Sequence, residues 1–147
     1  MSALTAVFRI LQADSGVVTY VGHRRYPVEL PQNADLPALV LTLVDERDGR
    51  HLLGSNRYPV ARFLVDCVAD QTPDGYWDAD VVGEAVKAAL IDYRGKVEGY
   101  QVDDIGHDDI DFTDKGEGGQ HWRRRLGFLM RYREIEPEDD EDSPPGA

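Results

Sequence analysis

The segment YPVELPQNADLPALVLTLVD, residues 26–45, ends in the most apolar stretch of the chain. Alternate side chains of an extended strand point to opposite faces. Both faces are almost entirely apolar here: one carries Leu39, Leu41 and Leu43, and the other carries Val40, Thr42 and Val44. A strand that is apolar on both faces lies inside a sheet, so we predict a central strand preceded by a loop with two Leu-Pro steps.

The neighbouring segments extend this sheet. Asp48-Gly49 is a strong hairpin signal, and YPVARFLVDCVAD, residues 58–70, alternates regularly enough to be the partner strand. In the last third, a long hairpin is predicted, with one arm over residues 97–112, the glycine-rich tip TDKGEGGQ, and a second arm over residues 121–133. A short strand ending at Pro27 completes about five strands.

Two helices are predicted from apolar residues at helical spacing. The first runs from Ser2, a possible cap, to Gly16. The second follows a Pro73-Asp74-Gly75 turn, is capped by Asp78 or Asp80, and ends at Gly95. The order predicts an α+β fold, in which both helices pack on one face of a mostly antiparallel, mixed sheet. Residues 1–134 are expected to form this single domain.

Charge and composition exclude several classes of protein. The 147 residues carry a net charge of −12, which disfavours a protein that coats nucleic acid with a basic surface. The segment EIEPEDDED, residues 134–142, holds seven of the acids, and residues 135–147 are predicted to be a disordered acidic tail. The single cysteine, Cys67, excludes an internal disulfide. No apolar run approaches the about 18 residues of a membrane span, so we expect no membrane partner.

Motifs for catalysis or cofactor binding are absent from the sequence. The segment GEGG, residues 116–119, lacks the Lys-Ser/Thr of a phosphate-binding loop, and no histidine has a context that marks it as catalytic. The acidic arm DDIGHDDIDFTD, residues 103–114, could offer Asp109 and Asp111 to a hard cation, but its spacing does not fit a calcium loop. On an extended chain Asp103, Asp109 and Asp111 would point the same way. We expect no cofactor and no metal.

The final strand carries a basic stripe. Trp122, Leu126, Phe128, Met130 and Tyr132 share one face, and His121, Arg123, Arg125, Arg131 and Arg133 share the other. The stripe is interpreted either as the partner of the acidic arm beside it or as an interface to an acidic neighbour or to DNA phosphates.

The order of these segments resembles a known family. The helix LTAVFRILQAD, the stretch VGHRRYPVELPQNADLPALVL, the helix EAVKAALIDY and the closing WRRRLGFLMRYRE resemble the tail completion, or tail terminator, proteins of long-tailed bacteriophages. The resemblance covers residues 3–134 and departs from the family in the acidic arm and the tail.

The resemblance implies a structural role without catalysis. Such proteins form a ring, usually of six subunits, on the end of the tail tube; the ring stops tube growth and joins the head, and DNA passes through it. The implied partners are other copies of the chain, the tail tube protein and a head completion or connector protein, and the implied location is the head-proximal end of the virion tail, after assembly in the host cytoplasm.

Candidate interface residues follow from this role. Proline fixes φ, so the loop ELPQNADLP would lose little freedom on assembly. The candidates for the subunit interface, the tube interface or the lumen are Pro31, Gln32, Asn33, Pro37, Asp109, Asp111, Arg123, Arg125, Arg131 and Arg133. Three alternatives remain open: another head-to-tail connector subunit, a divalent-metal-dependent enzyme that uses the aspartates of residues 103–114, and an acidic DNA mimic that blocks DNA-binding proteins.

Overall fold

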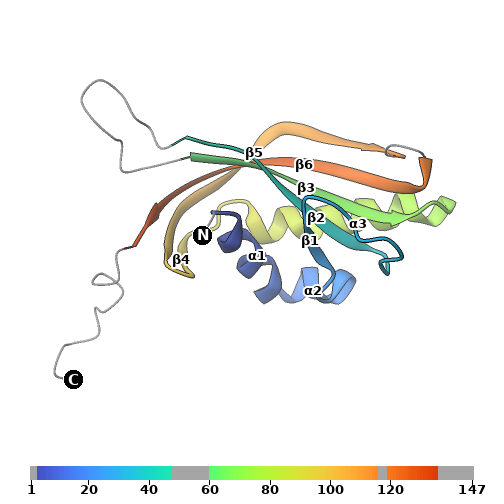
Figure 1. The fold of residues 1–147 in the computed structure, drawn as a ribbon, viewed down its shortest axis with the longest axis horizontal. Helices are drawn as coiled ribbons and strands as arrows, with labels where there is room; N and C mark the ends of the chain where they lie inside the picture. Colours follow the sequence, from blue (N-terminus) through green and yellow to red (C-terminus); the bar gives the residue numbers. More distant parts are fainter. Residues whose placement is uncertain (1–2, 48–59, 116–118, 136–147) are drawn as a thin grey trace.

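The chain forms one mixed sheet with three helices on one of its faces (Figure 1). The structure is a computed structural model that describes residues 3–47, 60–115 and 119–135. The strand order is β1-β2-β3-β6-β5-β4, and only the β1–β2 pair is parallel. The elements are α1 Leu4–Ala13, α2 Ser15–Val21, β1 Arg25–Pro27, β2 Ala38–Arg47, β3 Val60–Asp70, α3 Pro73–Leu90, β4 Gly95–Val97, β5 Tyr100–Asp114 and β6 His121–Glu134.

The predicted fold class is confirmed, and the described residues form six strands rather than five and three helices rather than two. The β2–β3 pairing and the long β5–β6 hairpin are as expected. The Asp48-Gly49 turn, residues 116–118 of the glycine-rich tip and residues 136–147 of the acidic tail lie outside the described residues.

The first predicted helix is split in two by Asp14. α1 ends at Ala13, and Asp14 adopts an extended conformation with φ −87° and ψ 116°. Its side chain accepts a hydrogen bond from the Val17 backbone N–H at 3.0 Å, which caps α2. Aspartate is a strong N-cap because its carboxylate satisfies an otherwise unpaired N–H. Gly16 therefore lies inside α2, and Gly22 ends that helix.

The predicted limits of the second helix are wrong at both ends. α3 begins at Pro73, not after it, because proline is well tolerated at the first helical position. Gly75 lies in the first turn, where a Cβ would collide with the backbone carbonyl of Asp70. At the other end α3 stops at Leu90, and Gly95 starts the unpredicted strand β4.

The core fills the space between the helices and the inner face of the sheet. The Phe63 and Phe128 rings of β3 and β6 stack there, with centroids 5.4 Å apart. Cys67 is buried in the same layer, and desolvation raises the pKa of its thiol. Among the described residues, no helix lies on the opposite face of the sheet (Figure 1), and this face carries the candidate surface.

Two register shifts in β5 change the direction of the acidic arm. One lies between Val102 and Asp104 and the other between His107 and Asp111, against a regular β6. Bulges of this kind re-aim side chains. The expectation that Asp103 and Asp111 point the same way is therefore wrong: Asp103 pairs with Arg133 at 3.7 Å, whereas Asp111 points to α3.

Candidate assembly surface

The basic stripe of β6 lies on the face of the sheet that has no helix. Its best-anchored member is Arg125, whose Nε and Nη2 donate to the two carboxylate oxygens of Asp66 on β3 at 2.8 and 3.0 Å. Asp66 is only 6% exposed, so its charge needs this bidentate partner. The guanidinium of Arg125 is thereby fixed in place.

The other arginines of the stripe are held more loosely. Arg123 pairs with Asp114 at 3.2 Å, and Arg133 pairs with Asp103 at 3.7 Å. The interpretation that the acidic arm neutralises the stripe is thus confirmed for these two arginines and wrong for Arg125, whose partner is on β3. Arg131 is exposed and makes no ion pair with any described residue.

The loop before β2 reaches the same surface. A hollow of about 230 Å³ lies between residues 28–30 and the side chains of Arg123 and Arg125, and Val40 and Val68 contribute to its lining. A second hollow joins residues 29–34 to Gln120 and His121. The structure therefore brings Pro31, Gln32 and Asn33 close to the basic stripe, a proximity that spacing in the sequence did not indicate.

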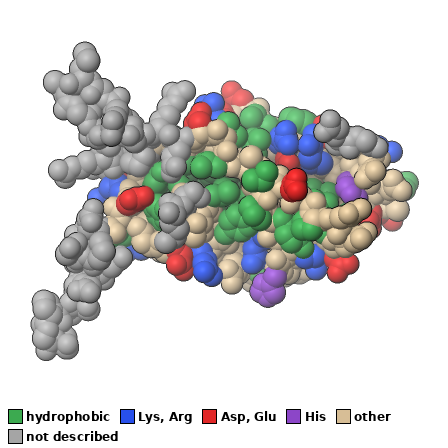
Figure 2. Space-filling view, in the orientation of Figure 1, with side chains coloured by type: hydrophobic (Ala, Val, Ile, Leu, Met, Phe, Trp, Pro, Cys, Tyr) green, Lys and Arg blue, Asp and Glu red, His purple; other side chains and the backbone are tan. Residues whose placement is uncertain are grey.

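Hydrophobic side chains are exposed around these polar groups. Val28, which lines the first hollow, is 69% exposed. Figure 2 shows hydrophobic side chains gathered between basic and acidic ones on a side of the molecule that includes the helices as well as the sheet. A mixed apolar and charged patch of this kind is typical of a protein–protein contact.

Besides Arg131 and Arg133, three candidate residues lie away from the two hollows. Pro37 is half-buried before β2, where its carbonyl accepts a hydrogen bond from Arg24 Nε at 2.9 Å. Asp109 is exposed on the free edge of β5. Asp111 belongs to a separate polar cluster on the helix side of the sheet.

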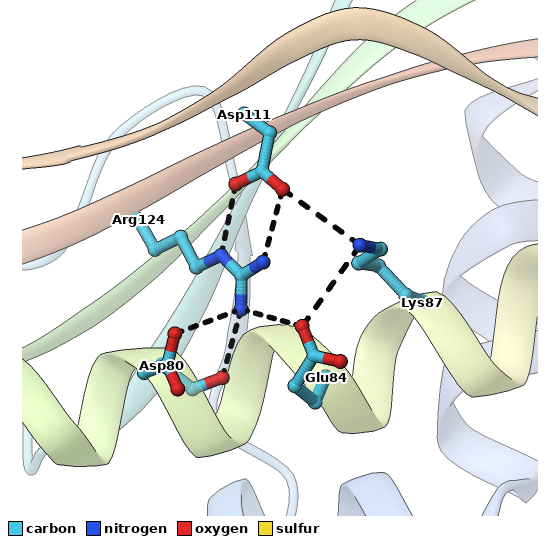
Figure 3. A network of polar contacts seen from close by, with 5 residues as sticks. All are labelled: Asp80, Glu84, Lys87, Asp111 and Arg124. Carbon is cyan, nitrogen blue, oxygen red and sulfur yellow. Dashed lines mark hydrogen bonds and ion pairs between the residues drawn. The ribbon is translucent and has the colours of Figure 1, made fainter.

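The centre of that cluster is Arg124, which the sequence analysis did not single out (Figure 3). Its Nε and Nη2 donate to Asp111 at 2.9 and 3.0 Å, and its Nη1 contacts Asp80 and Glu84 of α3 at 3.3 and 2.9 Å. Lys87 Nζ lies 3.7 Å from Asp111. Arg124 stands between Trp122 and Leu126 on the apolar face, and this interruption could have indicated a buried cation with carboxylate partners.

The arrangement makes Arg124 a clamp between β5, β6 and α3. A Cβ on Gly83 would lie 2.7 Å from Arg124 Cδ, so α3 requires glycine there to let the guanidinium approach. The hydrogen bonds that Arg124 donates to Asp111 lower the pKa of Asp111 and raise the pKa of Arg124. The carboxylates of this cluster pair with Arg124 and Lys87, and among the described residues no three His, Cys, Asp or Glu side chains are grouped so that they could hold a metal.

Comparison with known proteins identifies the family. Residues 5–133 match the tail completion protein gp17 family. The chain belongs to this family. Membership supports a structural role in a phage tail rather than an enzymatic one. No curated protein matches the chain.

A solved structure shares the fold of this tail completion protein. It belongs to the virion of a native gene transfer agent particle, is 21% identical, and superimposes with a TM-score of 0.68 over 90% of this chain and 95% of that one. Among the described residues, no helix is both long and apolar enough to cross a membrane.

Proposed function

We propose that copies of this chain form a ring, of six subunits, that caps the tail tube, stops its growth and presents the surface that joins the head. The observation that carries the proposal is the match to the tail completion family over residues 5–133. The ring would be part of the virion, assembled in the host cytoplasm, with the tube protein on one side and a head completion or connector protein on the other.

The helix-free face of the sheet supports a docking role. Arg123 Nε and His121 Nδ1 are buried there without a hydrogen-bond partner among the described residues. Unpaired buried donors and acceptors cost free energy, so a partner group that enters the hollow beside them would relieve this cost. We assign Pro31, Gln32, Asn33, Arg123, Arg125 and Arg131 to the contact with the tube or a neighbouring subunit.

The net charge of −12 suits a ring through which DNA passes. Like charges repel, so an acidic lumen would let the duplex slide without binding. The acids of residues 135–147 would add to this negative charge.

A phage from which this gene is deleted tests the proposal by negative-stain microscopy of lysates. Free heads beside overlong, headless tails would support tube termination. Tails of normal length without heads would contradict length control and favour a connector role instead. Co-sedimentation with purified tail tubes or with portal-bearing heads would then decide which side the protein binds. Normal, complete virions would contradict both structural roles.

A further inference from the structure

The two edges of the sheet carry opposite charges. At one edge, β1 begins at Arg25, which directly follows His23 and Arg24. At the other edge, β5 pairs with β4 only through residues 100–102, so within the described chain its remaining length has no strand on its outer side. That free length carries Asp103, Asp104, Asp108, Asp109, Asp111 and Asp114.

The charges at the β1 edge are not neutralised within the subunit. Arg24 donates to the carbonyls of Pro37 and Tyr20, and Arg25 donates to the carbonyl of Gly22 at 2.8 Å. Neither arginine has a carboxylate partner among the described residues. Desolvation lowers the pKa of Arg25, as expected for a partly buried cation without a counter-charge.

On the β5 edge, one aspartate likewise has no oppositely charged partner among the described residues. Asp103, Asp108, Asp111 and Asp114 are paired with arginines of β6 or β3. Asp109, in contrast, is exposed at the bulge and has no cation partner in the described part of the chain.

The two edges also lie at the same level of the sheet. The register runs from Arg25 through Leu39, Cys67 and Arg124 to Thr113. Two residues further along β1, the row that starts at Pro27 crosses the sheet in the same way and ends at Asp111 on β5. A closed ring joins two different surfaces of each subunit by rotation. Asp109 lies in the bulge just beyond Asp111, so the basic and acidic groups lie within a few residues of the same level along the strands, which suits such a contact.

We infer that the Arg24–Arg25 edge of one subunit docks against the Asp109 edge of a second copy of this chain. This inference rests on the proposed ring and names the contact that builds it. Two identical edges would bring like charges together, so the arrangement favours head-to-tail over two-fold pairing. A row of aspartates also protects a free edge against strand addition, but protection alone does not require a basic edge opposite.

Charge reversal tests the pairing. The variants are Arg25→Glu and Asp109→Lys, alone, together in one chain, and as an equimolar mixture of the two single variants. The matched controls, Arg9→Glu and Asp78→Lys, make the same reversals on the exposed surfaces of α1 and α3. The readout is the protein concentration at which half of the purified tail tubes carry a ring, with circular dichroism melting to verify folding.

Each single edge variant should raise the protein concentration needed for half of the tubes to carry a ring by about tenfold or more. Reversing one charge of the pair replaces an attraction by a repulsion. The controls should change it less than about twofold, as exposed charges do. The doubly reversed chain and the mixture should recover most of the loss, because each interface again joins opposite charges. If Arg25→Glu does not fold, Arg25→Gln should give a smaller increase than Asp109→Lys.

Two failures are distinguishable. If the wild-type chain forms no ring on tubes, the proposed function is wrong and the inference has no ring to explain. If wild-type rings form but the edge variants behave like the controls, or the double variant recovers nothing, the edge pairing alone is wrong.

Discussion

Arg124 is a cation on the apolar face of a strand, and its neighbours explain how it is accommodated. Its side chain is 8% exposed and its partners come from β5 and α3. A buried charge without such partners would be strongly destabilising. At the residue scale, the β5–β6 hairpin is therefore fixed to α3 by charge-assisted hydrogen bonds as well as by apolar packing.

The first prediction concerns the glycine that admits Arg124. Gly83→Ala should destabilise the protein by roughly 1–2 kcal/mol, because overpacking against the clamped guanidinium outweighs the gain in helix propensity. Urea unfolding measures this. Gly106→Ala is the control, since nothing lies within 4 Å of the added Cβ. A stabilised Gly83→Ala variant would mean that Arg124 moves aside freely.

The second prediction concerns pH. Arg124 holds the pKa of Asp111 below its usual value. The stabilisation by this pair is therefore complete above the unfolded pKa of about 4, and is lost as the pH falls through the lower folded pKa. Asp111→Asn should cost about 1–3 kcal/mol near neutral pH, with the deficit shrinking below about pH 4. Urea unfolding across this pH range measures the deficit, and one that stays constant would contradict the assignment.

At the scale of elements, the strands with regular alternation were predictable from the sequence, whereas the ends of the helices and the bulges of β5 were not. The alternation in β2, β3 and β6 was read correctly because burial on each face follows a period of two. The ends of α1 and α3 were missed because Asp14 caps a new helix and Gly75 fits against Asp70. The bulges of β5 leave no mark in composition, so the direction of Asp111 was not predictable.

The candidate surface was likewise predictable from the sequence only in part. The arginine stripe follows from alternation alone, and so does its position on one face of β6. Its proximity to Pro31 depends on how a loop from the other side of β2 crosses the sheet, which no spacing rule specifies. Arg124 was missed because three consecutive arginines look like one basic segment, although the middle one faces the core.

The third prediction tests the clamp as a unit. Arg124→Met should destabilise the protein by about 3 kcal/mol, because it leaves Asp111 in a partly buried site with Lys87 as its remaining cation. Amide hydrogen exchange should accelerate over residues 111–114. Arg123→Met is the control and should cost less than about 1 kcal/mol, since its pair with Asp114 is partly exposed. Equal losses would contradict a special role for Arg124.

At the scale of the whole molecule, helices cover one face of the sheet and leave the other for partners. Polar anchors, exposed apolar side chains and a proline-containing loop meet on that open face. The sheet edges then provide oppositely charged sides. In the proposed ring, a subunit of this design would have separate surfaces for the tube and for its two neighbours.

The fourth prediction separates assembly from folding at the loop. Pro31 is exposed, so Pro31→Ala removes no buried contact and should lower stability by at most about 1 kcal/mol. Tube binding should weaken by about two- to fivefold, because the freed loop must be ordered on assembly. Melting and tube co-sedimentation measure the two effects. Pro73→Ala, at the exposed start of α3, is the control for binding; equal loss of stability and binding would reject the interface role of Pro31.

The most direct test of the account is a tube-growth experiment with purified components. Tail tubes are incubated with this protein, fresh tube subunits are added, and lengths and tips are recorded by electron microscopy. We predict a ring at one tip and tubes that no longer lengthen from that end. Tubes that keep growing at both ends, with no added density at either tip, would contradict the central claim.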